Sequence, residues 1–506
     1  MTTRTKTTRR IRAGLATATI ATIAIAGCST GSASEGDGPK TEVTWMAILH
    51  APSPPEPDGP VESALQDHTG IDINFQWVPD AVREEKLSAA LASDTLADIV
   101  TLPRVDDSTI RRALTSGQFW DVEPYLDEFP NLAAIDPQTI EGARLDGHLY
   151  GVPIQKPKAR YGALIRQDWL DNLGLEVPRT IEELGDVARA FAHDDPDGNG
   201  EDDTYGILDR QESFSLGFAT IAGYFGAGLA FELDDDDNVI SSYDTPALKE
   251  AMQWYRGLYE DGALNQEFVT LQKADHMDAY GTGKGGIFFG TLGTGSGFIN
   301  LAADIDPGSP MVWTRVNDMT YGDVPRRIVS DTNGGLGGWL AVARSNVKTE
   351  EDLRVVLRFI NDLMDEEAFS AMTNGIEGTH FRFDDEGVVE ILDQQKWTSE
   401  VEIFKSSRPS ELVKDYLTDD PTTNEANEMI AENADHAVTN VAQSLSSETF
   451  DSRWTQIGQA ATDAYNKFMV GDLDIDGYQA AIDKARTDGL GQIEQEFTDS
   501  YRELNQ

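Results

Sequence analysis

The sequence predicts an α/β protein with two lobes. Strand and helix patterns alternate from about residue 41 onward, which predicts largely parallel sheets. The roughly 465 residues that follow the N-terminal region exceed what one compact core holds, so we expect two lobes. No segment is apolar enough for long enough to span a membrane, so the body of the protein is expected to be soluble.

The first residues have the layout of a bacterial signal peptide. Five basic residues precede the apolar stretch 13–26, which at about 14 residues is too short to span a bilayer. The motif Ile-Ala-Gly-Cys at 25–28 resembles a lipoprotein lipobox, in which the cysteine receives the lipid. We expect a signal peptide with its lipobox over residues 1–28, lipidation (palmitate) at Cys28, and a flexible tether over residues 29–40. The alternative is an ordinary cleavage site beside a chance cysteine.

Composition restricts the possible partners. Cys28 is the only cysteine, so an internal disulfide is excluded. With 88 Asp and Glu against 40 Lys and Arg, the formal net charge is −48, which excludes nucleic acid as a partner. The same field disfavours a strongly anionic ligand unless a local basic pocket opposes it.

Periodicity and capping residues place the main elements in order. We expect strands over 43–46, 71–77, 98–102 and 339–343, and mostly helices over the last hundred residues. Helix starts are indicated at Thr180 with Glu183, at Thr245-Pro246, and at Thr349 with Asp352. The acidic run 234–237 indicates a hairpin turn.

One acidic loop has the composition of a calcium site. Oxygen-bearing side chains recur in it around two glycines, as a hard cation with about six to eight oxygen ligands requires. An EF-hand would need Glu where Gly206 stands, so we expect a calcium loop of another type, and a metal-free acidic loop is the alternative. The expected ligands are Asp195, Asp197, Asn199, Glu201 and Asp203.

Signatures of enzymes are mostly missing from the sequence. The seven histidines show no zinc-binding spacing. Neither of the glycine-rich stretches 283–285 and 293–297 has nucleotide-binding spacing. A glycosidase carboxylate pair cannot be judged by counting in so acidic a chain. Trp and Tyr side chains stack on sugar rings, and several of them lie outside obvious helix cores. These candidates are Trp45, Trp77, Trp120, Tyr150, Tyr224, Phe289, Trp313 and Trp339.

Several segments resemble the extracellular solute-binding proteins of carbohydrate ABC importers, in the maltose-binding-like superfamily. Residues 147–153 match the pattern G-x-x-Y-G-V-P that such proteins carry before the chain crosses between lobes. Residues 166–175 resemble the R-x-D-W-L-x-x-L-G-L stretch of a subgroup that includes alginate-oligosaccharide-binding proteins, and residues 375–380 match a later segment. The subgroup carries calcium in the loop at 195–206, although Thr204 stands where some members have a further acidic ligand.

The resemblance implies a two-lobed, periplasmic-binding-protein-like fold of type II with lobes joined by hinge strands. It assigns residues 41–157 and 328–372 to the first lobe, and residues 158–327 and 373–506 to the second. It further implies a structural calcium ion and delivery of the ligand to an ABC transporter permease.

We therefore predict a lipid-anchored, extracytoplasmic monomer on the outer face of the cytoplasmic membrane. It binds a sugar or oligosaccharide by lobe closure and catalyses no reaction. The alternatives are a surface-anchored hydrolase that acts on carbohydrates, and the same scaffold binding a peptide or another small solute. The expected ligand-binding residues are Trp120, Tyr150, Arg166, Asp168, Phe289 and Trp339.

Overall fold

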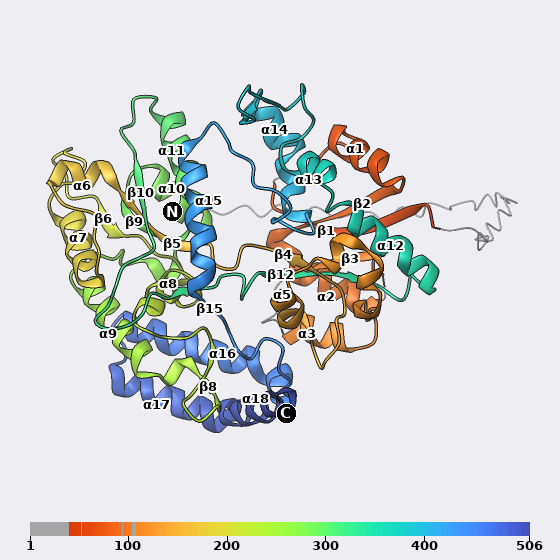
Figure 1. Cartoon of the computed structure of the whole chain (residues 1–506). Helices are drawn as coiled ribbons and strands as arrows, with labels where there is room; N and C mark the ends of the chain where they lie inside the picture. Colours follow the sequence, from red (N-terminus) through yellow and green to blue (C-terminus); the bar gives the residue numbers. More distant parts are fainter. Residues whose placement is uncertain (1–39, 52, 94, 104–107, 506) are drawn as a thin grey trace, which may run out of the picture. The chain divides into compact units, whose positions relative to one another are not determined.

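The computed structural model describes residues 40–51, 53–93, 95–103 and 108–505, which contain two principal β-sheets and their covering helices (Figure 1). The predicted signal peptide, its lipobox and Cys28 lie outside the described residues. Among the helices of the described ranges, none combines the length and the apolar composition needed to cross a membrane.

The first sheet has five strands in the order β2-β1-β3-β12-β4. β1 is parallel to β2 and β3, whereas β12 is antiparallel to β3 and β4. The strands are β1 (Glu42–Leu49), β2 (Asp72–Pro79), β3 (Ile99–Leu102), β4 (Val152–Gln155) and β12 (Leu336–Val342). The four strands predicted from periodicity are thereby confirmed.

The second sheet has four strands in the order β10-β5-β9-β6. They are β5 (Tyr161–Arg166), β6 (Tyr205–Ile207), β9 (Gly285–Thr291) and β10 (Trp313–Val316). In this second sheet only the pair β6 and β9 is parallel. The expectation of largely parallel sheets is therefore wrong. The reason lies in the connections, because strands that return from the other sheet, such as β12, enter in the opposite direction.

Three two-stranded ribbons complete the strands. They are β7 (Phe231–Leu233) with β8 (Val239–Ser241), β11 (Ile328–Val329) with β15 (Ala437–Val438), and β13 (Phe381–Phe383) with β14 (Val389–Ile391). The acidic run 234–237 turns between β7 and β8, as predicted.

The helices surround both sheets. In the first half of the chain they are α1 (Pro60–Thr69), α2 (Arg83–Ser93), α3 (Ser108–Thr115), α4 (Pro130–Ala133), α5 (Pro137–Ala143), α6 (Gln167–Leu173), α7 (Ile181–His193), α8 (Gly217–Tyr224) and α9 (Pro246–Glu260). In the second half they are α10 (Lys273–Gly281), α11 (Thr294–Ile305), α12 (Glu350–Asp362), α13 (Glu366–Thr373), α14 (Gln394–Glu400), α15 (Pro421–Asn433), α16 (Glu448–Met469), α17 (Ile475–Ala485) and α18 (Gly491–Leu504).

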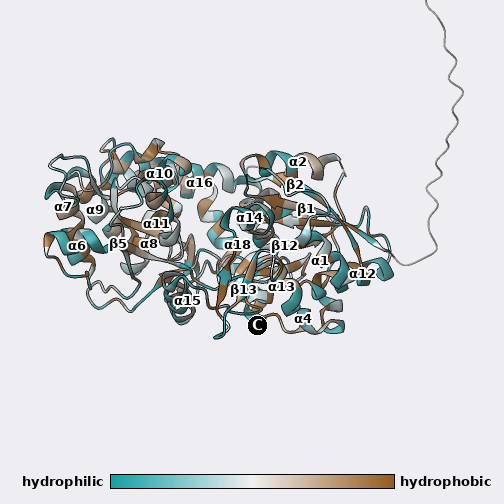
Figure 2. Ribbon diagram, turned by 90° about the horizontal axis from the view of Figure 1, so that it is seen from above, coloured by the Kyte–Doolittle hydropathy of each residue, from teal (hydrophilic) through white to brown (hydrophobic). Residues whose placement is uncertain are grey.

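The predicted helix starts are confirmed by their caps. The hydroxyls of Thr180, Thr245 and Thr349 accept hydrogen bonds from backbone N–H groups of the first turns of α7, α9 and α12. Such caps satisfy donors that the helix itself leaves open. The apolar stripe of each helix then packs on a sheet, and in Figure 2 outer helices such as α12 carry mostly hydrophilic colour.

The two principal sheets have separate apolar cores. One gathers around β1, β3 and β12 with α12, and the other gathers around β5 and β9 with α7 and α9. A further cluster joins α16 and α18 to the β7–β8 ribbon. The chain crosses between the sheets at residues 156–160 and again between β10 and β12. The lobe boundaries given above stay a prediction.

Candidate functional site

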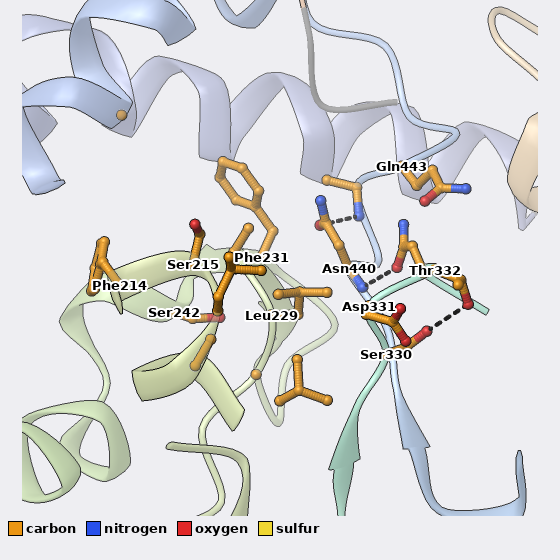
Figure 3. Close-up of a pocket in the computed structure, with 18 of the residues that line it drawn as sticks. Phe214, Ser215, Leu229, Phe231, Ser242, Ser330, Asp331, Thr332, Asn440 and Gln443 are labelled. Carbon is orange, nitrogen blue, oxygen red and sulfur yellow. Dashed lines mark hydrogen bonds between the residues drawn. The ribbon is translucent and has the colours of Figure 1, made fainter. Parts of the chain in front are cut away.

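The crossing segments border a cavity of about 560 Å³. Its lining comes from the segment after β4, from residues 329–337, from α8 and the β7–β8 ribbon, and from α16 with the residues that precede it. In Figure 3, Phe214 and Phe231 lie on one side, whereas Asp331 and Asn440 lie on the other. The cavity therefore has an aromatic wall that faces a polar wall.

The aromatic wall is formed by α16 and by the segments that carry Phe214, Phe231 and Tyr243. Trp454 stacks on Tyr243 with ring centroids 6.1 Å apart and an interplanar angle of 13°, and it also contacts Phe231 and Phe450. Phe214 lies 5.2 Å from Tyr243. Trp454, Tyr243 and Phe214 are only partly buried, so part of each side chain stays accessible. Aromatic ring faces bind the apolar faces of sugar rings.

The polar wall is held by hydrogen bonds between distant segments. Asn333 Oδ1 accepts a hydrogen bond of 2.6 Å from the backbone N–H of Asn440. Asp331 accepts from the backbone N–H of Arg160 at 3.0 Å and from its Nε at 2.8 Å. Because these contacts join the two crossings and the segment before α16, the wall is fixed before a ligand arrives.

Two buried polar atoms of the lining have no hydrogen-bond partner among the described residues. They are Ser242 Oγ and Gln443 Oε1, on residues that are 1% and 6% exposed. Gln443 Nε2 already donates to the carbonyl oxygen of Gly142 at 2.6 Å. A buried polar atom without a partner costs free energy, so both atoms leave hydrogen-bonding capacity unused beside the cavity.

Arg111 also lines this cavity, and its positive charge is paired with Asp451. Its Nε lies 3.1 Å from Asp451 Oδ1, and its two terminal nitrogens donate to the carbonyl oxygens of Gln443 and Leu445, each at 2.8 Å. Each nitrogen of this guanidinium therefore has an acceptor inside the protein.

The predicted site residues lie elsewhere. Trp339 is fully buried on β12, and its Nε1 donates to the carbonyl oxygen of Ala143 at 3.0 Å. Phe289 is 7% exposed within the core of the second sheet. The burial of both side chains follows from their places on strands inside the sheets.

Three of the other four predicted residues have polar partners inside the protein. Trp120 donates from Nε1 to the carbonyl oxygen of Val347 at 2.7 Å and lies under the guanidinium of Arg344. Tyr150 is half-buried, and burial raises its pKa.

Arg166 and Asp168 do come together, as a two-point ion pair at 2.8 and 2.5 Å. All six predicted residues are described, and none of them lines the cavity. Their contact with ligand stays a prediction. The residues that line the cavity carried no signal in the sequence, since a helical Trp such as Trp454 has the pattern of a core residue.

The predicted calcium loop follows α7. Asp195 accepts hydrogen bonds from the backbone N–H of Gly200, and the amide of Asn199 lies 2.9 Å from Asp197 and 3.3 Å from Asp203. Burial, with smaller effects of Asp195 and Asp203, raises the pKa of Asp197.

Lys284 binds one of the predicted calcium ligands of the same loop. The ammonium of Lys284 binds Asp203 and lowers the pKa of this carboxyl. Within the described ranges, no group of three or more His, Cys, Asp or Glu side chains is arranged to hold a metal ion. The loop thus has the oxygens of a cation site, but a cation would have to displace Lys284 from Asp203.

Two sheets joined by crossing segments around an aromatic and polar cavity define a protein that encloses a small ligand. The sequence profile described as bacterial extracellular solute-binding protein matches residues 51–361. The chain belongs to this family, which confirms the family predicted from the sequence motifs.

The matches to similar proteins cover nearly the whole chain. The polygalacturonan/rhamnogalacturonan-binding protein YtcQ of Bacillus subtilis is 31% identical over 95% of this chain and 96% of its own. Lipoprotein LipO of the same organism is 27% identical over 96% of this chain and 97% of its own. A solved structure from Bifidobacterium longum infantis, named as an HMO-binding solute-binding protein associated with an ABC transporter, matches with a TM-score of 0.69 at 18% identity. That match covers 91% of this chain and 98% of the solved chain, and it confirms the predicted fold class.

Proposed function

We propose that this protein captures an oligosaccharide outside the cell and delivers it to an ABC transporter. The observation that carries the proposal is the pairing of one aromatic wall, around Trp454 and Tyr243, with a polar wall around Asp331 and Asn440. Sugars need both, since their ring faces are apolar and their hydroxyls need hydrogen-bond partners. The names of YtcQ and of the Bifidobacterium protein, which both bind saccharides, support the same class of ligand.

The mechanism is reversible enclosure. The cavity lies where the chain crosses between the sheets, and a hinge there lets ligand contacts favour a closed state. Release then depends on the transporter, which binds the closed form and opens it. No covalent step is required.

Hydrolysis of the bound saccharide is the competing function. A glycosidase needs two carboxylates on either side of the scissile bond. Among the described residues that line the cavity, Asp331 is the only carboxylate, and it is already bound to Arg160. This arrangement supports a binding protein over an enzyme.

The anchor and the oligomeric state belong to the same proposal. The sequence motif at 25–28 supports a lipid on Cys28, and the name of the relative LipO is consistent with it. We propose a monomer held at the outer face of the cytoplasmic membrane by this lipid.

We also propose that the loop over Asp195, Asp197, Asn199, Glu201 and Asp203 binds a structural calcium ion. Its oxygen atoms support this, because Ca²⁺ prefers oxygen ligands. The ion would link residues that follow α7 to each other and would add no chemistry to the cavity.

A calorimetric screen tests the function. The purified protein is titrated with oligogalacturonides, milk oligosaccharides, fructo-oligosaccharides and short peptides, and the incubated sugars are then analysed for cleavage. Binding of a saccharide that stays intact supports the proposal. Binding of peptides alone, or the appearance of shorter sugars, contradicts it.

A further inference from the structure

One carboxylate, next to the cavity-lining Lys156, is shared by three cations. Glu411 Oε1 lies 2.5 Å from Lys156 Nζ and 3.9 Å from an Arg408 terminal nitrogen, and Oε2 lies 4.0 Å from Arg160 Nη1. Asp331 supplies the second carboxylate by binding Arg160. Three positive charges therefore face two negative charges, in a protein whose formal net charge is −48.

Backbone hydrogen bonds fix this cluster in place. The N–H of Gln155 donates to the carbonyl oxygen of Pro409 at 2.9 Å, and the N–H of Glu411 donates to the carbonyl oxygen of Gln155 at 2.8 Å. The N–H of Lys156 donates to the carbonyl oxygen of Gly335 at 2.9 Å. The backbone beside Lys156 and Glu411 is thus held at the end of β4, and a ligand need not order it.

Neighbouring charges do not remove the surplus. Burial and the positive charge of Arg408 lower the pKa of Lys405, against the effects of Glu402 and Glu411. Glu402 is exposed and at most balances Lys405. Although burial favours the neutral acid, Lys156, Arg408 and Arg160 hold the pKa of Glu411 below its usual value.

Two donors of the cluster face the cavity. Lys156 and Arg160 line it, and their side chains are 21% and 27% exposed. Lys156 Nζ has three N–H groups, of which Glu411 takes one. Arg160 binds Asp331 through Nε and Nη2, and its Nη1 donates no hydrogen bond within the described part of the chain.

We infer that the saccharide carries a carboxylate, as a uronic acid does, and that Lys156 Nζ and Arg160 Nη1 bind it. This inference rests on the proposed function, and it narrows the ligand from oligosaccharides in general to acidic ones. The carboxylate of the ligand completes the balance of charge in the cluster. Charge-assisted hydrogen bonds of this kind are roughly twice as strong as neutral ones.

The test compares an acidic ligand with its uncharged methyl ester. Trigalacturonate and its fully methyl-esterified form are titrated into the purified protein by calorimetry. We expect the free acid to bind at least about tenfold more tightly, because the ester loses the charge-assisted hydrogen bonds to Lys156 and Arg160. Added salt should weaken binding of the acid and leave binding of the ester nearly unchanged.

The variant Lys156→Gln should lose most of this preference. Its affinity for the acid falls about tenfold or more, whereas its affinity for the ester stays within about twofold. Lys158→Gln is the matched control, since Lys158 lies two residues away, contacts Gln138 and Asp136, and does not line the cavity. Arg160 is left in place because its loss would strand the buried Asp331.

The outcomes separate the inference from the proposed function. Equal binding of acid and ester, or binding of neutral oligosaccharides alone, overturns the inference and leaves the proposed function standing. Equal losses in Lys156→Gln and Lys158→Gln overturn the assignment to Lys156, because a general field would then be the cause. Retained binding of the ester proves that Lys156→Gln is folded. Failure of every saccharide in the wider screen overturns both proposals.

Discussion

A Cβ atom at Gly337 would lie 2.5 Å from Cε of Lys156. Gly337 sits on β12 beside the crossing segment, and both residues line the cavity. The absence of a side chain at this position therefore gives the lysine room to extend along β12. Glycine here acts through space and not through backbone conformation, since its φ lies outside the left-handed region.

Gly337→Ala should weaken the binding of trigalacturonate several-fold with little change in stability. The added methyl group displaces the flexible end of Lys156, while the backbone needs no change. Calorimetry and thermal unfolding measure the two quantities. Gly257→Ala on α9 is the control, because a Cβ there meets no atom of the described residues within 4 Å. An unchanged affinity in Gly337→Ala would show that the position of Lys156 does not matter.

Trp454→Leu should reduce the affinity for every saccharide that binds, acidic or neutral, by about tenfold. Leucine preserves apolar contact with Phe231 and Phe450 but removes the indole face. The control is Trp254→Leu, since Trp254 is also partly buried but packs on the core of the second sheet and does not line the cavity. Equal effects of both variants on affinity would contradict an aromatic wall that stacks on sugar.

Chelation should lower the melting temperature if the loop after α7 binds calcium. At a calcium concentration about 100 times the Kd, binding to the folded state alone adds about 2.7 kcal/mol to the free energy of unfolding. Asp197→Asn should abolish the response to calcium. Asp235→Asn removes the same charge from the acidic turn between β7 and β8 and should leave the response intact. An identical melting temperature with and without chelator in the unchanged protein would argue for a metal-free acidic loop.

Short-range patterns predicted much of the fold but little of the site. Thr180, Thr245 and Thr349 begin helices through contacts with residues three positions away, so the local sequence suffices to predict them. Lys156 and Glu411 are 255 residues apart, and only the completed fold brings them together. No local pattern carries information of that range.

The net charge of the whole chain could not predict the local charge beside the cavity. A net charge of −48 describes the average field of the protein and disfavours an anionic ligand, but the local surplus at Lys156, Arg160 and Arg408 has the opposite sign. Trp339 shows the same limit for aromatic residues, because its burial follows from the place of β12 inside the sheet and not from its neighbours in sequence.

Acid should destabilise the protein through His276. This side chain is 4% exposed on α10, its Nε2 lies 3.3 Å from the carbonyl oxygen of Leu208, and its Nδ1 has no partner among the described residues. Burial, followed by the charge of Arg210, lowers the pKa of His276 from 6.5 to about 4. The unfolded chain therefore takes up a proton at a higher pH than the folded protein does.

The stabilising effect of a neutral His276 is complete above pH 6.5 and disappears as the pH falls toward about 4, a loss of up to about 3 kcal/mol. Urea unfolding at pH 7, 6, 5 and 4.5 measures it against His276→Gln, which does not titrate. We expect the variant to be less stable at pH 7, because the imidazole packs against Tyr280 and Phe288, and expect the difference to shrink as the pH falls. A difference that stays constant from pH 7 to 4.5 would show that His276 titrates alike in the folded and unfolded states.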